Sequence, residues 1–271
     1  MFINNKFAAA FLLALTSVTV QGLPVVEDNG KVHLTATGRS GHLQTTLEVP
    51  MHHGGKVAAD HEDEDEDTAI TGRPTQYEST ILARRLLAKS KSGVLTTVFP
   101  SHLTSPRVPA AVADTPIGLP EYIASCEEPT GNPTVLSLKI STATINANAG
   151  SNVSLSLSWW DEYVHLTHQQ PWSAANLPRL NLVGYLEEIP QPEADEAGIP
   201  TCFVAAHPDS AMWLPGKKWA AHQGIWTRIV VQEVYWIGGF GDRNYIGWFD
   251  PEEWRAVTKE QWEAVRLPGE K

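Results

Sequence analysis

The chain has 271 residues and a formal net charge of −11, and 42% of its residues are hydrophobic. This apolar content is enough for a folded core, and the length allows one large domain or two small ones. The negative charge argues against nucleic acids and anionic membrane surfaces as partners, because contacts with phosphate groups need a basic surface.

The first residues have the pattern of a secretory signal. Lys6 precedes the apolar run "FAAAFLLALTSVTV", and small residues follow as far as Gly22. The run is short for a bilayer span, so we predict a signal peptide at residues 1–22 rather than a membrane anchor. We find no other long apolar run, and we therefore expect a secreted, extracellular protein without a membrane span.

Residues 23–75 are expected to form a poorly structured acidic linker or propeptide. Seven acidic residues lie between Asp60 and Asp67, and such a block repels itself and stays extended. Weak metal binding is an alternative for the histidines nearby, which are His52, His53 and His61. A solvated segment is the simpler explanation, and we predict no metal site.

The folded domain is expected at residues 76–267, and it begins with a helix. Four side chains in "ESTILARRLLAKSKSG" have helical spacing: Ile81, Leu82, Leu86 and Leu87. The next run, "VLTTVFP", predicts a strand, and the proline-rich residues 101–120 predict a loop. A second short strand, "EYIAS", leads to Cys126.

Two alternating runs then predict a β-hairpin. In "TVLSLKISTATINA", Leu136, Leu138 and Ile140 alternate with polar residues, and "NVSLSLSWW" alternates in the same way after the turn "NAG". The run "PRLNLVGYLEEI" predicts a further strand. A long irregular connection follows at residues 190–224, with a short helix expected around 194–207.

The run "IWTRIVVQEVYWIGG" predicts a strand that is buried on both sides. Period two places Trp226, Val230, Val234 and Trp236 on one face, and both faces are apolar, as in a closed sheet. The run "NYIGWF" returns beside it. Two terminal helices each have a capping-box pattern, formed by Asp250 with Glu253 and by Thr258 with Gln261. The order of these elements favours a mainly β (α+β) barrel of six or seven strands with flanking helices.

Three glycines, Gly238, Gly239 and Gly241, follow the long strand. Their spacing is Gly-Gly-x-Gly and a strand comes next, whereas a dinucleotide site needs Gly-x-Gly-x-x-Gly before a helix. We therefore interpret them as a turn at a barrel corner. The alternative is that their exposed backbone lies close to a ligand.

Three polar residues are candidates for a position near a ligand: His207, His222 and Arg228. His207 is followed by Pro208 and Asp209, but near neighbours rarely orient one another as a catalytic pair, and Asp209 is better suited to cap a turn. Arg228 lies within the buried strand, so it needs a charged partner or an anionic ligand. We expect its partner to be Glu233, Glu187 or a main-chain carbonyl.

The sequence contains no nucleophilic serine elbow and no zinc-binding His-Glu-x-x-His helix, and adjacent Asp161 and Glu162 do not form a glycosidase pair by spacing alone. We predict no catalytic residue.

The two cysteines, Cys126 and Cys202, are candidates for a disulfide in an oxidising compartment, the alternatives being free thiols or a reactive nucleophile. Asn152 begins a glycosylation sequon.

The run "HPDSAMWLPGKKW…HQGIWTRIVVQEVYWIGGFGDRNYIGWFDPEEW" resembles the CREG family of secreted glycoproteins, especially their fungal relatives. The run "ARRLLAKSKSGVLTTVFP" is similar to the opening helix and first strand of that family. The resemblance covers about residues 77–257, strongly in the last fifty residues and weakly in the middle. The family belongs to the flavin-binding split-barrel superfamily, together with the pyridoxamine 5′-phosphate oxidases.

The resemblance implies a split β-barrel, a homodimer, and a secreted or endolysosomal glycoprotein without established catalysis. It also implies that FMN binding is often lost, so we expect no cofactor, with FMN as the alternative. A short loop between Cys126 and Thr134 and the position of Gly224 depart from the cofactor-binding pattern. We therefore expect a non-catalytic protein that binds an unknown protein or glycan. The alternative is a flavin- or haem-dependent oxidoreductase, although no histidine follows Trp248 as an axial haem ligand.

Overall fold

The computed structural model describes residues 27–28, 31–37, 42–47, 72–102, 108–128, 130–217 and 222–271. The chain divides into two compact units, Met1–Glu64 and Asp65–Lys271. The predicted signal peptide, the acidic run at 60–67 and the three histidines beside it lie outside the described residues. These predictions therefore stay predictions.

The first unit contains a small antiparallel sheet in the order β1-β2-β3, formed by β1 (Glu27–Asp28), β2 (Lys31–Thr37) and β3 (His42–Leu47). Our prediction of a poorly structured segment did not include these strands. The sequence pattern of a strand was present, because apolar and polar residues alternate from Val32 to Thr37. This stretch pairs with the next strand through a register that runs from Val32–Leu47 to Thr37–His42.

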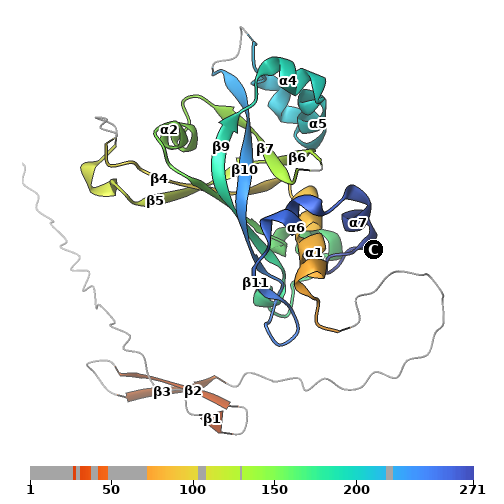
Figure 1. The fold of residues 1–271 in the computed structure, drawn as a ribbon. Coiled ribbons are helices and arrows are strands. Elements are labelled where there is room, and N and C mark those ends of the chain that lie inside the picture. The colour runs from red at the N-terminus through yellow and green to blue at the C-terminus, as the bar shows by residue number, and fades with distance from the viewer. Residues whose placement is uncertain are drawn as a thin grey trace, which may run out of the picture. The chain divides into compact units, whose positions relative to one another are not determined.

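The second unit is built on an antiparallel sheet in the order β5-β4-β8-β9-β10-β7-β6, with the short β11 added to β10 (Figure 1). Only Ile123 separates β5 from β6, so the two outermost strands are continuous in the chain and the sheet curls toward closure. The prediction of a mainly β split barrel with flanking helices is confirmed. The strands are β4 (Ser92–Val98), β5 (Pro116–Tyr122), β6 (Ala124–Glu127), β7 (Asn132–Leu138), β8 (Val153–Ser158), β9 (Arg179–Glu188), β10 (Gly224–Ile237) and β11 (Ile246–Trp248).

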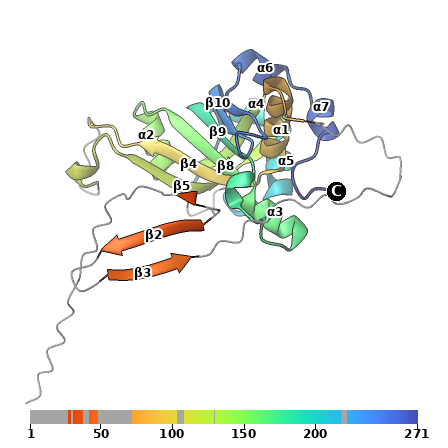
Figure 2. The ribbon, with the colours of Figure 1, turned by 90° about the horizontal axis from the view of Figure 1, so that it is seen from below.

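Seven α-helices flank this sheet among the residues described: α1 (Gln76–Lys89), α2 (Thr142–Asn148), α3 (Trp160–Thr167), α4 (Gln191–Glu196), α5 (Ile199–Ala206), α6 (Pro251–Ala256) and α7 (Lys259–Ala264). Helices α1, α6 and α7 gather at one end of the second unit, although α1 opens the unit and the other two close it (Figures 1 and 2). Buried Arg84 joins α1 to α6 by donating to the Trp254 carbonyl at 2.7 Å, and Arg85 joins α1 to α7 by donating to the Trp262 carbonyl at 3.1 Å.

The predicted helix caps are largely confirmed. Thr258 and Gln261 form the expected capping box at the start of α7. Asp250 caps α6 by accepting a hydrogen bond from the Glu252 amide. The prediction that the Glu253 side chain completes a capping box is wrong. The Glu253 carboxylate instead accepts a hydrogen bond from Gln76 of α1 at 3.2 Å.

The prediction of a loop at residues 101–120 is wrong for its last five residues, because β5 begins at Pro116. This strand lies at one end of the sheet order and pairs along its whole length with β4, from Val98–Pro116 to Ser92–Tyr122. An edge strand tolerates proline, because the missing amide hydrogen is needed on only one side. The proline-rich composition therefore concealed a strand.

The predicted hairpin between residues 134 and 160 is also wrong. β7 ends at Leu138, and α2 follows because the Ser141 hydroxyl accepts a hydrogen bond from the Thr144 amide as an N-cap. β8 pairs with β4 and β9 rather than with β7. Ile140, which we assigned to a buried face, is 61% exposed. The helix α3, which starts at Trp160, was missed.

The predicted long strand is confirmed as β10, but its alternation is interrupted. The register with β9 shifts between Val231 and Glu233, which is a β-bulge. As a result Ile229, Val231, Val234 and Trp236 all lie in the main core cluster, while Trp226 lies in a second one. The prediction that Trp226 and Trp236 share a face is therefore wrong.

The second core cluster joins α5 to the sheet. It brings Ile199 and Phe203 of the helix against Leu136 of β7 and Trp226 of β10. Phe203 and Trp226 meet edge to face at a centroid distance of 5.5 Å. This packing positions α5 beside the cavity described next.

Candidate functional site

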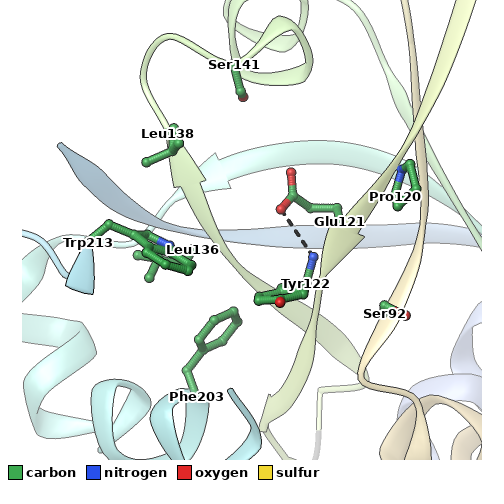
Figure 3. Close-up of a pocket in the computed structure, with 9 residues that line it drawn as sticks. All are labelled: Ser92, Pro120, Glu121, Tyr122, Leu136, Leu138, Ser141, Phe203 and Trp213. Atoms are coloured by element: carbon green, nitrogen blue, oxygen red, sulfur yellow. Dashed lines mark hydrogen bonds between the residues drawn. The ribbon is translucent and has the colours of Figure 1, made fainter. Parts of the chain in front are cut away.

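A cavity of about 450 Å³ lies where β5 and β7 diverge beside α5 (Figure 3). Its residues come from separate segments of the chain and are mostly apolar or aromatic. They are Ser92, Pro120, Glu121, Tyr122, Leu136, Leu138, Ser141, Phe203 and Trp213. Glu121 and Tyr122 extend from β5 toward the side where Leu136, Leu138 and Trp213 lie (Figure 3). The site is therefore a concave, largely apolar space with one carboxylate.

Glu121 is the charged group of this cavity. Its Oε1 accepts a hydrogen bond from the Tyr122 amide at 3.2 Å. Burial raises the pKa of the Glu121 carboxyl above its usual value, and the bond from Tyr122 offsets only part of that effect. Among the residues that the structure describes, no lysine, arginine or histidine forms an ion pair with it.

Tyr122 and His207 form one wall beside the cavity. Their rings stack at a centroid distance of 4.3 Å, and Phe203 packs against His207 at 5.0 Å. His207 is buried, and its Nε2 donates to the Ile123 carbonyl at 2.9 Å. Asp209 accepts a hydrogen bond from the Tyr122 hydroxyl at 3.1 Å, and this bond raises the pKa of the tyrosine. His207 and Asp209 thus have separate partners rather than one another.

The disulfide predicted between Cys126 and Cys202 is present, with the two Cα atoms 5.8 Å apart. It links β6 to α5, and Cys202 directly precedes Phe203 of the cavity wall. Gly224 lies close to Trp213 of the cavity lining, because a Cβ atom there would lie 2.3 Å from the Trp213 carbonyl oxygen. The residue that we noted as a departure is therefore needed for the close approach of Trp213.

Arg228 has carboxylate partners, but mainly not those we expected. Its Nε lies 3.0 Å from Glu127, and its second partner is Glu193 of α4. Glu187 lies opposite Arg228 in the pairing of β9 with β10, and these carboxylates help to raise the pKa of the guanidinium although its burial opposes this. Glu233 is not among the ion-pair partners of Arg228, since it lies five positions further along the same extended strand. The arginine holds α4 and β6 to the sheet.

The other candidates lie elsewhere. His222 is exposed and precedes β10. The three glycines follow the far end of that strand, in the turn to β11, where the Gly238 amide donates to the Tyr245 carbonyl at 3.0 Å. Asn152 is exposed just before β8. In the described part of the chain, no cluster of three or more histidine, cysteine, aspartate or glutamate side chains is arranged to hold a metal ion.

Replacing Gly239 with valine is expected to destabilise the fold by about 1–3 kcal/mol. Gly239 has a φ of +142°, and a Cβ atom would lie 2.8 Å from the Asn176 carbonyl oxygen. Thermal melting of both proteins measures the loss. Gly241→Ala is the control, because its Cβ would approach only the Ile246 side chain, at 3.3 Å. An unchanged melting temperature together with loss of a bound chromophore would show that the glycines serve a ligand.

Sequence reasoning missed the residues that the cavity brings together: Glu121, Tyr122, Phe203 and Trp213. The one available signal was a glutamate between Pro120 and Tyr122 at the start of a predicted strand. That signal was weak, because the partners of Glu121 across the cavity are distant in the sequence.

Glu121→Gln is expected to raise the melting temperature at neutral pH and to leave it unchanged in acid. The folded-state pKa of Glu121 lies above its unfolded value, so the wild type loses stability relative to the variant as the pH rises through the folded pKa. Thermal melts from about pH 4 to about pH 8 test this difference. Glu196→Gln, at an exposed position on α4, is the control. A lower melting temperature of Glu121→Gln at neutral pH would mean that the carboxylate has a stabilising partner.

Comparison with known proteins gives one family. The family described as "CREG, beta-barrel" matches residues 74–256. A search of curated proteins finds no match. No helix within the described ranges is both long and apolar enough to cross a membrane.

Several solved structures are similar at low identity. The "heme binding protein from Mycobacterium smegmatis" has 16% identity and a TM-score of 0.48, over 69% of this chain and 62% of that chain. The protein Atu2129 from Agrobacterium tumefaciens, described as of unknown function, has 22% identity and a TM-score of 0.45, over 64% of this chain and 61% of that one. An F420 reductase has 15% identity and a TM-score of 0.36, over 59% and 97%. The chain thus spans less than two thirds of the length of the first two.

These distant structures carry no argument about function. The family match covers the described barrel from the start of α1 to the end of α6. The chain therefore belongs to the CREG β-barrel family.

Proposed function

We propose that this protein is a secreted glycoprotein that acts by binding a partner and catalyses no reaction. The observation that carries the proposal is the character of the cavity between β5, β7 and α5. Its walls are mainly apolar and aromatic, and they present one carboxylate. Sites of this kind bind ligands through shape, with a few polar groups that set orientation.

Of the polar side chains that sequence reasoning selected for chemistry, His207 and Arg228 have structural partners, whereas His222 is exposed. His207 is bonded to the Ile123 carbonyl, Asp209 to the Tyr122 hydroxyl, and Arg228 to Glu127 and Glu193. General acid–base catalysis needs a positioned group of suitable pKa within reach of a reacting atom, often with a second group that orients it. Glu121 is a single carboxylate, and this favours binding over catalysis at the cavity.

A flavin- or haem-dependent oxidoreductase is the alternative that the family's superfamily suggests. FMN carries a phosphate and haem carries two propionates, so both need cationic or amide donors. The described lining of the cavity includes no lysine, arginine or histidine, and the Glu121 carboxylate would repel either anion. The cavity therefore does not fit these cofactors.

An absorbance spectrum of the natively purified protein tests the proposal. We expect no band of flavin or haem at a stoichiometric level. As a control, FMN is added to a second sample and the unbound FMN is removed by gel filtration. The FMN that stays with the protein measures retention of the cofactor. A stoichiometric cofactor band in the native protein would overturn the proposal and favour the oxidoreductase.

Three further features belong to the same proposal. The disulfide and the exposed Asn152 support secretion and N-glycosylation, which a mass shift after N-glycosidase treatment would test. Apolar side chains that remain exposed along the sheet support a homodimer, which light scattering would test. These side chains are Val94 and Val98 of β4, Tyr185 of β9 and Trp248 of β11. The macromolecular partner in this proposal is a protein or a glycan.

A further inference from the structure

We propose that the cavity between β5, β7 and α5 binds a small organic cation, with its ammonium group beside Glu121 and its apolar body against Leu136, Leu138 and Trp213. The inference rests on the binding role proposed above and names the chemistry of one ligand. It depends on three properties of the site: an unpaired carboxylate, an aromatic and apolar lining, and a volume suited to a small molecule.

The charge of the site is the first step. Three of the other half-buried glutamates have an arginine partner, Glu127 with Arg228, Glu128 with Arg84 and Glu270 with Arg85, whereas Glu78, Glu162 and Glu253 have no described ion pair. Glu121 is half-buried too, but within the described ranges it has no such partner and accepts one bond, from the Tyr122 amide. A carboxylate held partly out of water is stabilised by a positive charge nearby. The chain does not supply that charge among its described residues, so a cationic ligand is the complementary occupant.

The lining is the second step. Tyr122, Phe203 and Trp213 surround the space near the carboxylate, and Leu136 and Leu138 complete the wall on the side of β7 (Figure 3). Aromatic rings attract ammonium groups through their negative faces, and the same rings bury an apolar body. A negative group beside aromatic walls therefore selects a cation with an apolar or aromatic body over an anion.

The dimensions are the third step. A volume of about 450 Å³ lies within the range of small-molecule sites. The walls are held in place by constraints outside the cavity: the disulfide fixes α5 beside β6, and β10 packs closely against the Trp213 main chain at Gly224. Such a preformed site needs little ordering when the ligand binds, which favours affinity for a small molecule.

Calorimetric titration of the purified full-length protein with three amines tests the proposal. The probes are tryptamine, phenethylamine and hexylamine, and N-acetyltryptamine and indole-3-acetate are the neutral and anionic counterparts of the first. We expect at least one amine to bind saturably. N-acetyltryptamine should bind about tenfold or more weakly than tryptamine, which is the loss of one charge-assisted contact. Indole-3-acetate should not bind.

Two matched variants locate the contact. Glu121→Gln keeps the shape of the side chain and should reduce amine affinity to that of the neutral compound, while its melting temperature shows that it is folded. Glu196→Gln, on the exposed side of α4, should bind amines like the wild type. Equal binding of tryptamine and N-acetyltryptamine, or an unaffected Glu121→Gln variant, would overturn the proposal.

Two other outcomes of the titrations would also overturn the proposed amine site. If none of the three amines binds at millimolar concentration, no small organic cation occupies the site. If only a lysine-containing peptide binds, in a manner that depends on Glu121, the occupant is a side chain of a protein partner instead. These failures are distinct from that of the proposed function, because the amine titrations do not test it, whereas a cofactor band in the native spectrum overturns it.

Discussion

Replacing both Cys126 and Cys202 with serine is expected to lower the free energy of unfolding by about 4 kcal/mol. The disulfide joins residues 76 positions apart, so in the chain-entropy model its loss releases a long loop in the unfolded state. Urea denaturation of the wild type and the double variant measures the difference. The wild type measured with a reducing agent serves as the control and should lose a similar amount.

The disulfide also has a local consequence. It anchors the middle of α5 to β6, directly before Phe203, so its loss should loosen the wall of the cavity. Amine binding should therefore weaken in the double variant even where the protein remains folded. An unchanged denaturation midpoint would contradict the stabilising role, because a bond that constrains only flexible segments does not affect unfolding.

Replacing Gly184 with alanine is expected to destabilise the protein by about 3 kcal/mol or more. An added Cβ atom would lie 1.9 Å from the Val230 carbonyl oxygen and 2.9 Å from its carbonyl carbon. Both atoms are main chain, in the middle of the pairing between β9 and β10, so the contact cannot be relieved by rotating a side chain. The strands would have to separate at this point, which weakens the centre of the sheet.

Chemical denaturation of Gly184→Ala and of the control Gly241→Ala measures this effect. Gly241 lies outside the sheet, and its nearest neighbour is the end of the Ile246 side chain. A change of less than about 0.5 kcal/mol at Gly184, the range of an ordinary surface substitution, would contradict the close packing of the two strands.

Several elements of the fold were predictable because they depend on local patterns. Helix α1 has helical spacing and a Thr75–Glu78 capping box, and α7 has the same kind of cap. The strands β8, β9 and β10 were visible as alternating or apolar runs, since a strand with a buried face repeats with a period of two. The family was identifiable from the long run that includes β10 and the glycine turn.

The errors occurred where a residue's role depends on distant partners. The pattern of "TVLSLKISTATINA" fits a strand throughout, but the cap at Ser141 turns its second half into a helix. Pro116 and Pro120 indicated a loop, yet their position at the sheet edge makes them part of β5. The bulge after Val231 reversed the faces of β10, and its only local mark in the sequence is the adjacent polar pair Gln232 and Glu233, both exposed in the structure.

The sequence by itself determined the composition of the core, most of the secondary structure, the pair of cysteines and the family. Only the tertiary structure decided the order of the strands, the carboxylate partners of Arg228 and the cavity around Glu121. The physical reason is that period and propensity act over a few neighbouring residues, whereas Glu121, Leu136, Phe203 and Trp213 meet only when the curled sheet brings β5, β7 and α5 together. The charge of Glu121 became informative only in that setting, because the burial of a carboxylate and the absence of a described partner are properties of the folded chain.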